Sequence, residues 1–420
     1  MKRVQIDKTQ VGDIILTASH SKAGKAIRAS TGAVVSHAII CVQYGSIIDS
    51  TADGVQSRNL QREFFEDDEE IYVFRLRDPV PPHLMSKIVD YARSQIGARY
   101  SIPEAVRSVA SVRKPRGRRQ YCSRLIAQAY RHAGISLVPD QDYCAPEDLR
   151  KSPLLVELPD MTEYLSEEEA QGWRAGAGAL DRQKEAQNAV LSAVRRLDGS
   201  VETFEDVDRV VEQHPEWDEE IAQAYLSSGY LDLWREMVGR HPWRYDLRLA
   251  LALDPDLASD IRAYCVETIR EYHTGGERFA VMLAYYQAAQ ERTPRVSRAH
   301  LVELYRTLVR LENSRRSVAR VWLLRHHPDD VAQFMQRVEP HSESWFAIVD
   351  RVEPMLGLMA RASIEATGSL EVCSSCGDTP AKDLRIVNEA EAMPGVPSLR
   401  LCGDCARIRR GWGELLEPVD

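Results

Sequence analysis

The 420-residue sequence lacks any long hydrophobic run. No segment approaches the ~18 apolar residues that a transmembrane helix needs. The N-terminal residues, MKRVQIDKTQVGD, also lack the apolar core of a secretory signal peptide. These two absences lead us to expect a cytoplasmic protein without a transmembrane segment.

Cysteine is scarce as well, with eight residues in the chain. This number is too small for a disulfide scaffold, so metal ligation, a reactive thiol or core packing are the expected roles. The formal net charge of -9 argues against nucleic acid as a partner. The content of 44% hydrophobic and 28% charged residues is that of a soluble globular protein.

Residues 1–160 alternate between strand and helix patterns, which predicts a small α+β domain. Strands are expected in GDIILTA, SHAIICVQ, SIIDST and IYVFRL, and a polar connection in SKAGKAIRAST. Helices are expected in PPHLMSKIVDYARSQIG, which has Pro at its start and Gly at its end, and in the run that follows Cys122 and stops at Gly134.

The strand patterns nearly disappear in residues 161–368. Helical spacing replaces them in segments such as EEIAQAYLSSGYLDLWREMV and HLVELYRTLVRLENSRRSVARVWLLRH. We therefore expect an all-helical domain here, built as a bundle or an irregular array. Residues 369–420 differ again and are expected to form a third, small module.

Two CxxC motifs define that module, with 25 residues between them. Their cysteines are Cys373, Cys376, Cys402 and Cys405. Two such motifs can complete a tetrahedral four-sulfur shell, the usual structural zinc site, whereas redox-active or unpaired cysteines are the alternative. The motifs resemble those of zinc-ribbon and treble-clef modules. A closed shell leaves no position for substrate, so we expect structural zinc and no cofactor for catalysis.

Cys122 stands at the start of a predicted helix, after the basic stretch RKPRGRRQ. A helix N-terminus favours the thiolate, so Cys122 is a candidate nucleophile, although a cysteine there can also be a small buried residue. A nucleophilic thiol needs a base, usually histidine. His83 lies in a Pro-rich turn and His132 lies too far along the helix, whereas His37 opens a predicted strand.

Asp49 lies on the strand that follows the His37 strand. A three-residue hairpin loop would place His37 and Asp49 on the same face as diagonal neighbours, and a two-residue loop would place them on opposite faces. The sequence leaves both arrangements open.

Several motifs resemble, in order, the landmarks of the circularly permuted branch of the NlpC/P60 papain-like superfamily. They are VGDIILT, STGAVVSHAIICV, IIDSTADGVQ, ARSQIGARYS and YCSRLIAQAY. The branch includes proteins similar to the YiiX and YaeF hydrolases and, more distantly, to lecithin:retinol acyltransferase. Its histidine strand precedes its cysteine helix, as in this chain, and the resemblance covers about residues 10–155.

The resemblance implies roles for individual residues. Cys122 matches the nucleophile, His37 the general base and Asp49 the third, orienting residue. Tyr121 and Tyr100 match aromatic positions near the substrate cleft. Relatives commonly have an acidic residue two positions after the cysteine, where this chain has Arg124, so the charge of the substrate-binding pocket is expected to differ.

The remaining residues of note have simpler expected roles. The basic run at residues 113–119 leads into Cys122 and could attract an anionic substrate, although most charge runs are solvated loops. Cys41, Cys144 and Cys265 are expected to be core residues.

Three functions remain open at this point. The first is a cysteine hydrolase that cleaves an amide bond in a peptide or protein, as the resemblance implies. The second is an acyltransferase or lipid thioesterase acting on an acylated substrate, as the more distant relatives imply. The third is a binding module without turnover, which the presence of Cys122, His37 and Asp49 together argues against.

Overall fold

The computed structural model describes residues 1–18, 33–100, 119–175, 179–254, 258–270, 275–330, 338–386, 398–412 and 414–419. The expected polar connection SKAGKAIRAST and residues 113–118 of the basic run lie outside the described residues. The chain forms two compact units. The first comprises Met1–Arg240 and Tyr286–Val302, and the second comprises His241–Tyr285 and Glu303–Asp420.

The first unit is built on a six-stranded antiparallel sheet. Its order is β5 (Gly54–Asn59), β4 (Ser46–Thr51), β3 (His37–Gln43), β2 (Ile14–Thr17), β6 (Ile71–Leu76) and β7 (Leu155–Leu158). The four predicted strands are confirmed as β2, β3, β4 and β6. The two edge strands were not predicted from the sequence, and neither were β1 (Lys2–Val4) and β8 (Thr162–Tyr164), which pair with each other.

Both faces of this sheet are covered. Helices α2 (Pro82–Ser94) and α4 (Cys122–His132) lie where the sequence predicts them and pack with Ala38, Ile40 and Val42 of β3. The alternate residues Ile39 and Cys41 join a second core with residues of β1 and the segment before β8. This alternation follows from the two-residue period of a strand. A short helix, α5 (Pro146–Arg150), adds to the α4 side.

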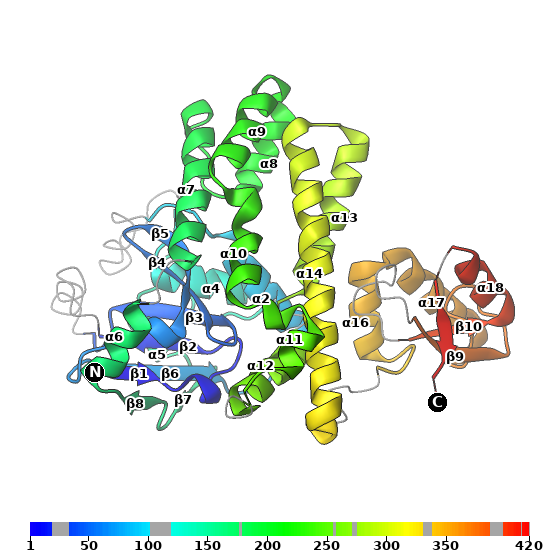
Figure 1. Ribbon diagram of the computed structural model, residues 1–420, viewed down its shortest axis with the longest axis horizontal. Helices are drawn as coiled ribbons and strands as arrows, with labels where there is room; N and C mark the ends of the chain where they lie inside the picture. Colours follow the sequence, from blue (N-terminus) through cyan, green and yellow to red (C-terminus); the bar gives the residue numbers. More distant parts are fainter. Residues whose placement is uncertain are drawn as a thin grey trace. The chain divides into compact units, whose positions relative to one another are not determined.

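The first unit continues into helices beyond residue 160. They are α6 (Glu167–Ala175), α7 (Ala179–Leu197), α8 (Phe204–Gln213), α9 (Asp218–Ser227) and α10 (Leu233–Arg240). Figure 1 shows α7 rising above the β4 and β5 end of the sheet. Lys184 Nζ of α7 lies 2.7 Å from Asp53 Oδ2 in the β4–β5 turn. The α+β part and these helices are therefore in direct contact.

The second unit contains two hydrophobic cores. Helices α11 (Leu247–Leu251), α12 (Ala258–Arg270) and α14 (Val296–His326) form the first core around Trp322 and Leu323. Helix α13 (Glu277–Arg292) and α14 each have residues in both units.

Short 3₁₀ helices lie along the whole chain, at Ile6–Lys8, Leu60–Arg62, Pro215–Trp217, Tyr230–Asp232 and Pro242–Arg244.

The second core joins helices to the cysteine motifs. Helices α16 (Glu343–Val352) and α17 (Pro354–Thr367) pack with a three-stranded sheet of order β10 (Leu399–Cys402), β9 (Ala381–Ile386) and β11 (Leu416–Pro418), and α18 (Gly403–Gly411) follows β10. Trp345 of α16 is fully buried, and its indole Nε1 donates to the Ser398 carbonyl at 2.8 Å. The small module therefore shares its core with α16 and α17.

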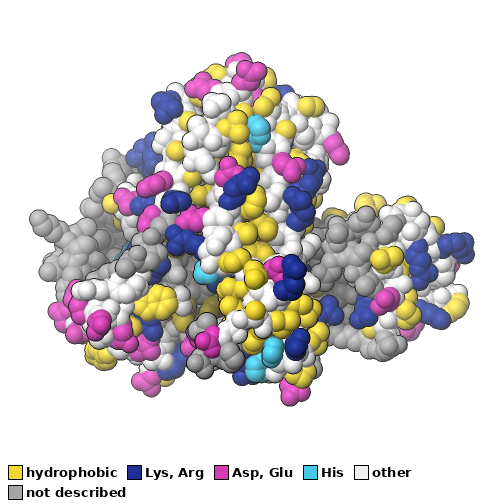
Figure 2. Space-filling model, viewed as in Figure 1, with side chains coloured by type: hydrophobic (Ala, Val, Ile, Leu, Met, Phe, Trp, Pro, Cys, Tyr) yellow, Lys and Arg dark blue, Asp and Glu magenta, His cyan; other side chains and the backbone are white. Residues whose placement is uncertain are grey.

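Some apolar side chains remain on the surface of the helical region. Figure 2 shows hydrophobic side chains over α11 and the neighbouring part of α14, where Leu249, Val321 and Leu324 are exposed. Among the described residues, none of the helices combines the length and the apolar character needed to cross a membrane. The domain limits predicted at residues 160 and 368 stay predictions.

Candidate active site and metal centre

Cys122 is the first residue of α4, and the residue before it, Tyr121, is the N-cap. The side chain of Tyr121 makes no capping hydrogen bond. The first N–H groups of a helix have no partner within the helix, so they and the helix dipole favour negative charge at this position. The buried residues Leu125, Ile126 and Ala129 anchor the helix from its apolar face. The structure therefore places the Cys122 thiol at the kind of position that the sequence predicts.

The β3–β4 hairpin decides whether His37 and Asp49 share a face. Its turn has two residues, but the register shifts by one between Cys41 and Gln43, as in a β-bulge. Beyond the shift Ile39 pairs with Asp49, so His37, two residues before Ile39, points to the same side as Asp49. The bulge therefore produces the diagonal arrangement that the sequence left open.

His37 contacts both other candidate residues. Its Nε2 lies 2.8 Å from Asp49 Oδ2, and the Cys122 thiol is close enough to act on the ring. Because Nε2 faces Asp49, Nδ1 is the ring nitrogen left for the thiol. Burial lowers the pKa of His37, but the hydrogen bonds with Asp49 and Cys122 outweigh it and raise the pKa to about 10. The site thus favours a protonated imidazole beside the thiol.

Asp49 is fully buried and has a second partner that was not predicted from the sequence. Arg58 of β5 donates its Nε to Asp49 Oδ1 at 3.2 Å and its Nη2 to Asp49 Oδ2, and its Nη1 reaches Glu63 Oε2 at 3.1 Å. Burial raises the pKa of Asp49, but the hydrogen bond with His37 and the Arg58 charge lower it overall. Only the two-residue alternation within GVQSRN could have indicated Arg58, and β5 itself was not predicted.

The predicted substrate-binding residues lie around Cys122 in different surroundings. Tyr100 is half-buried. Burial, the larger cause, and the charge of Cys122 both raise the pKa of its phenol. Tyr121 is buried and its hydroxyl donates to the Asp142 carbonyl at 2.8 Å. Arg124 is buried as well, with its guanidinium over the rings of Tyr121 and Tyr143 and Nη1 donating to the Arg119 carbonyl at 2.9 Å. Their roles toward a substrate stay predictions.

Three other cysteines are core residues, as predicted. Cys41, Cys144 and Cys265 are all buried. Burial raises the pKa of the Cys144 thiol, and it raises the pKa of the Cys265 thiol to about 12. Both thiols are therefore protonated at neutral pH and poor nucleophiles.

The four remaining cysteines meet in the second unit. The sulfur atoms of Cys373, Cys376, Cys402 and Cys405 all lie within 4.8 Å of one another. The first motif turns back on itself, since Gly377 N donates to the Cys373 carbonyl at 2.9 Å, and the second motif forms the start of α18. Four sulfurs at this spacing could bind one metal ion.

The cysteine cluster is supported by buried polar contacts. His341 is buried, and its Nε2 lies 2.9 Å from the hydroxyl of Ser374, which follows Cys373. Arg400, two residues before Cys402, donates its Nε to Asp383 Oδ1 at 2.7 Å. These contacts fix both motifs to the surrounding fold.

Comparison with known proteins gives a family match for the N-terminal part of the chain and a similarity to a solved structure. Residues 8–151 match the sequence model of a family described as permuted papain-like amidase enzyme, YaeF/YiiX, C92 family. The chain is also similar to the crystal structure of metalloprotein yiiX from Escherichia coli O157:H7. The similarity covers 36% of this chain and 97% of the yiiX chain, with 19% sequence identity and a TM-score of 0.29. A search of curated proteins found no match. The family match points to a papain-like amidase, and so to the cysteine hydrolase class, for this part of the chain.

Proposed function

We propose that the protein is a cysteine hydrolase that cleaves an amide bond in a peptide or protein through an acyl-enzyme on Cys122. The observation that carries the proposal is the arrangement around the N-terminus of α4: Cys122 is its first residue and acts on the His37 ring, and His37 Nε2 lies 2.8 Å from Asp49 Oδ2. The family match over residues 8–151 supports the reaction class.

The first half of the reaction forms a thioester. The Cys122 thiolate attacks the amide carbonyl carbon, and the N–H groups at the start of α4 are suited to stabilise the negative oxygen that develops. The protonated His37 then gives its proton to the departing amine as the C–N bond breaks. Asp49 stays ionised and keeps the imidazole ring in place.

The second half uses water. Neutral His37 takes a proton from a water molecule, which attacks the thioester carbonyl carbon. The C–S bond breaks, the carboxylic acid product leaves, and the Cys122 thiolate and protonated His37 are restored. Arg58 supports both halves indirectly, because its two contacts with Asp49 fix the carboxylate that orients His37.

We also propose that Cys373, Cys376, Cys402 and Cys405 bind one structural zinc ion. The four sulfurs lie within 4.8 Å of one another, and four thiolates form the closed shell that structural zinc prefers. The metal has no step in the proposed reaction.

Trapping the acyl-enzyme tests the proposed function. The protein would be incubated briefly with p-nitrophenyl acetate, a general acyl donor, and the acetylated residue identified by mass spectrometry, while a peptide mixture would reveal amide cleavage. We expect transient acetylation of Cys122 and peptide cleavage that both Cys122→Ala and His37→Ala abolish. Cleavage that persists in Cys122→Ala would contradict the proposal.

A further inference from the structure

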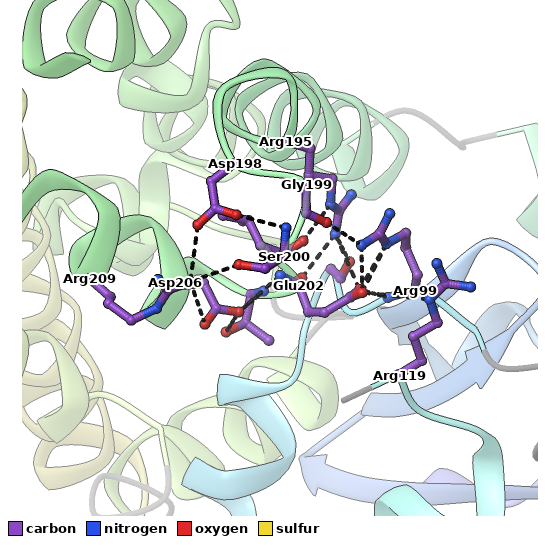
Figure 3. Close-up of polar contacts among 12 residues, drawn as sticks. Arg99, Arg119, Arg195, Asp198, Gly199, Ser200, Glu202, Asp206 and Arg209 are labelled. Atoms are coloured by element: carbon purple, nitrogen blue, oxygen red, sulfur yellow. Dashed lines mark hydrogen bonds and ion pairs between the residues drawn. The ribbon is translucent and has the colours of Figure 1, made fainter. Parts of the chain in front are cut away.

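The segment between α7 and α8 carries a buried carboxylate that the proposed mechanism does not use. Glu202 is 5% exposed, and its partner is Arg99, 103 residues earlier in the chain. Arg99 Nε lies 3.1 Å and 3.0 Å from the two carboxylate oxygens, Nη2 lies 2.6 Å from Oε1, and the Arg99 backbone N–H donates to Oε2 at 3.1 Å. Figure 3 shows this cluster.

Two more arginines complete the cluster. Arg119 Nε lies 3.6 Å from Glu202 Oε1, and Arg195 of α7 donates its Nη2 to the backbone carbonyls of Glu202 at 2.9 Å and Gly97 at 2.8 Å. Burial raises the pKa of Glu202, but the hydrogen bonds and charge of Arg99 outweigh it and lower the pKa overall. Glu202 is therefore an anion at neutral pH, held among three guanidinium groups.

The two stretches that Glu202 joins both lead to the candidate active site. Tyr100, next to Arg99, lies near enough to Cys122 for the charge of Cys122 to raise the pKa of the Tyr100 phenol. Arg119 lies three residues before Cys122. Gln120 N donates to the Arg99 carbonyl at 3.0 Å, which ties the two stretches together directly in front of α4.

Helix α7 packs closely against the backbone just before Arg99. Gly97 has a φ of 90°, and a Cβ at this position would lie 2.2 Å from Cδ1 of Leu191 on α7. By contrast, Asp198, at the start of the same segment, has its ion pair within the helical region, with Arg209 at 3.5 Å. Glu202 is thus the carboxylate of this segment that reaches the approach to Cys122.

We infer that Glu202 is a positioning residue for Cys122, acting through Arg99 and Arg119. The inference rests on the proposed function, because it concerns the alignment of Cys122 with His37. It makes the segment 198–203 of the helical region part of the framework of the active site. The α+β part alone then lacks one component of that framework.

The test is the pH profile of Cys122 alkylation in the full-length Glu202→Gln variant, measured with iodoacetamide and site-resolved mass spectrometry. Misalignment of Cys122 and His37 weakens their ion pair, so the midpoint of the profile should rise by about half a pH unit, with about threefold slower labelling below the midpoint. Loss of the negative charge alone would act in the opposite direction, because it makes a nearby thiol easier to ionise.

Asp198→Asn is the matched control and should leave the profile unchanged. A Glu202→Gln profile equal to that of the wild type, or shifted to lower pH, would overturn the inference. If Glu202→Gln cannot be recovered folded, the Arg99→Lys variant replaces it. A raised midpoint would then support the inference, and an unchanged or lowered midpoint would overturn it. Should wild-type Cys122 react no faster than Cys144, the proposed function fails together with the inference; a normal wild-type profile with an unchanged variant overturns the inference alone.

Discussion

His37 lies between a carboxylate and a thiol, and its protonation state follows from both neighbours. With a pKa of about 10, the imidazole keeps its proton at neutral pH, and Cys122 is among the groups that raise this pKa. A protonated ring beside the thiol favours the thiolate, which is the nucleophilic form. In the proposed mechanism this pair carries out the attack, and the reactivity of Cys122 should depend on Asp49 and Arg58 as well.

Asp49→Asn should slow Cys122 alkylation at pH 7 by on the order of tenfold, since the neutral amide can still hold the ring but no longer stabilises its charge. The measurement is the rate of iodoacetamide labelling at Cys122, with the thermal unfolding of each variant as a control for folding. A rate equal to that of the wild type would exclude Asp49 as the orienting residue.

Asp49 should also make stability depend on pH on the acid side. The folded-state pKa of Asp49 is lowered, so its contribution to stability is present above the unfolded value and is lost as the pH falls through the folded one. The difference in unfolding free energy between wild type and Asp49→Asn should therefore shrink below about pH 4. Denaturant unfolding at several pH values measures it, and a difference that grows on acidification would contradict the assignment.

Much of the site could be predicted at the residue scale, and what was missed has a physical reason. Cys122 was recognisable because a helix pattern begins at it. The relation of His37 to Asp49 was not, because a one-residue shift between Cys41 and Gln43 reverses the face and leaves no mark in the sequence. Arg58 was missed because it lies on a strand that was itself missed.

At the scale of elements, hydrophobic strands and amphipathic helices were predictable and polar edge strands were not. β2, β3, β4 and β6 contain apolar runs that face two cores. β5 has the sequence GVQSRN, and the second half of it is only partly buried. An edge strand needs few apolar residues because one side of it has no neighbouring strand, so its pattern is weak.

The contact of α7 with the sheet region gives a prediction at this scale. Gly97→Ala should lower the unfolding free energy by about 2 kcal/mol, because a Cβ meets both an unfavourable positive φ and Leu191. Gly134→Ala is the matched control, since Gly134 has a φ of 86° and none of the described residues lies within 4 Å of the added carbon. Denaturant unfolding of both variants compares them, and equal losses would mean that Leu191 yields without strain.

At the scale of the whole molecule, the local sequence pattern predicts the order of the regions along the chain but does not predict which residues of different regions contact one another. The sequence separates an α+β region, a helical region and a cysteine module. It contains no sign that Glu202 pairs with Arg99, because contacts between residues 103 positions apart depend on the assembled fold. The core that joins Trp345 to the cysteine module was hidden for the same reason.

The proposed zinc site should be separable from the thiol chemistry. One zinc ion per chain should copurify with the protein, and Cys376→Ser should expose the region around α18 to proteolysis, because metal binding and folding are coupled in small modules. Chelation should leave the labelling rate of Cys122 unchanged, since Cys122 and the four cysteines belong to different units. Loss of Cys122 labelling that added zinc restores would show that the metal helps to form the active site.

The most direct test of the central claim is site-resolved iodoacetamide labelling of the folded wild-type protein at pH 6. Free thiols are protonated and slow at this pH, whereas a thiolate paired with protonated His37 reacts. We predict that Cys122 is labelled faster than Cys41, Cys144 and Cys265 and that His37→Ala removes this advantage. Equal or slower labelling of Cys122, or an advantage that survives His37→Ala, would contradict the assignment of Cys122 as the activated nucleophile.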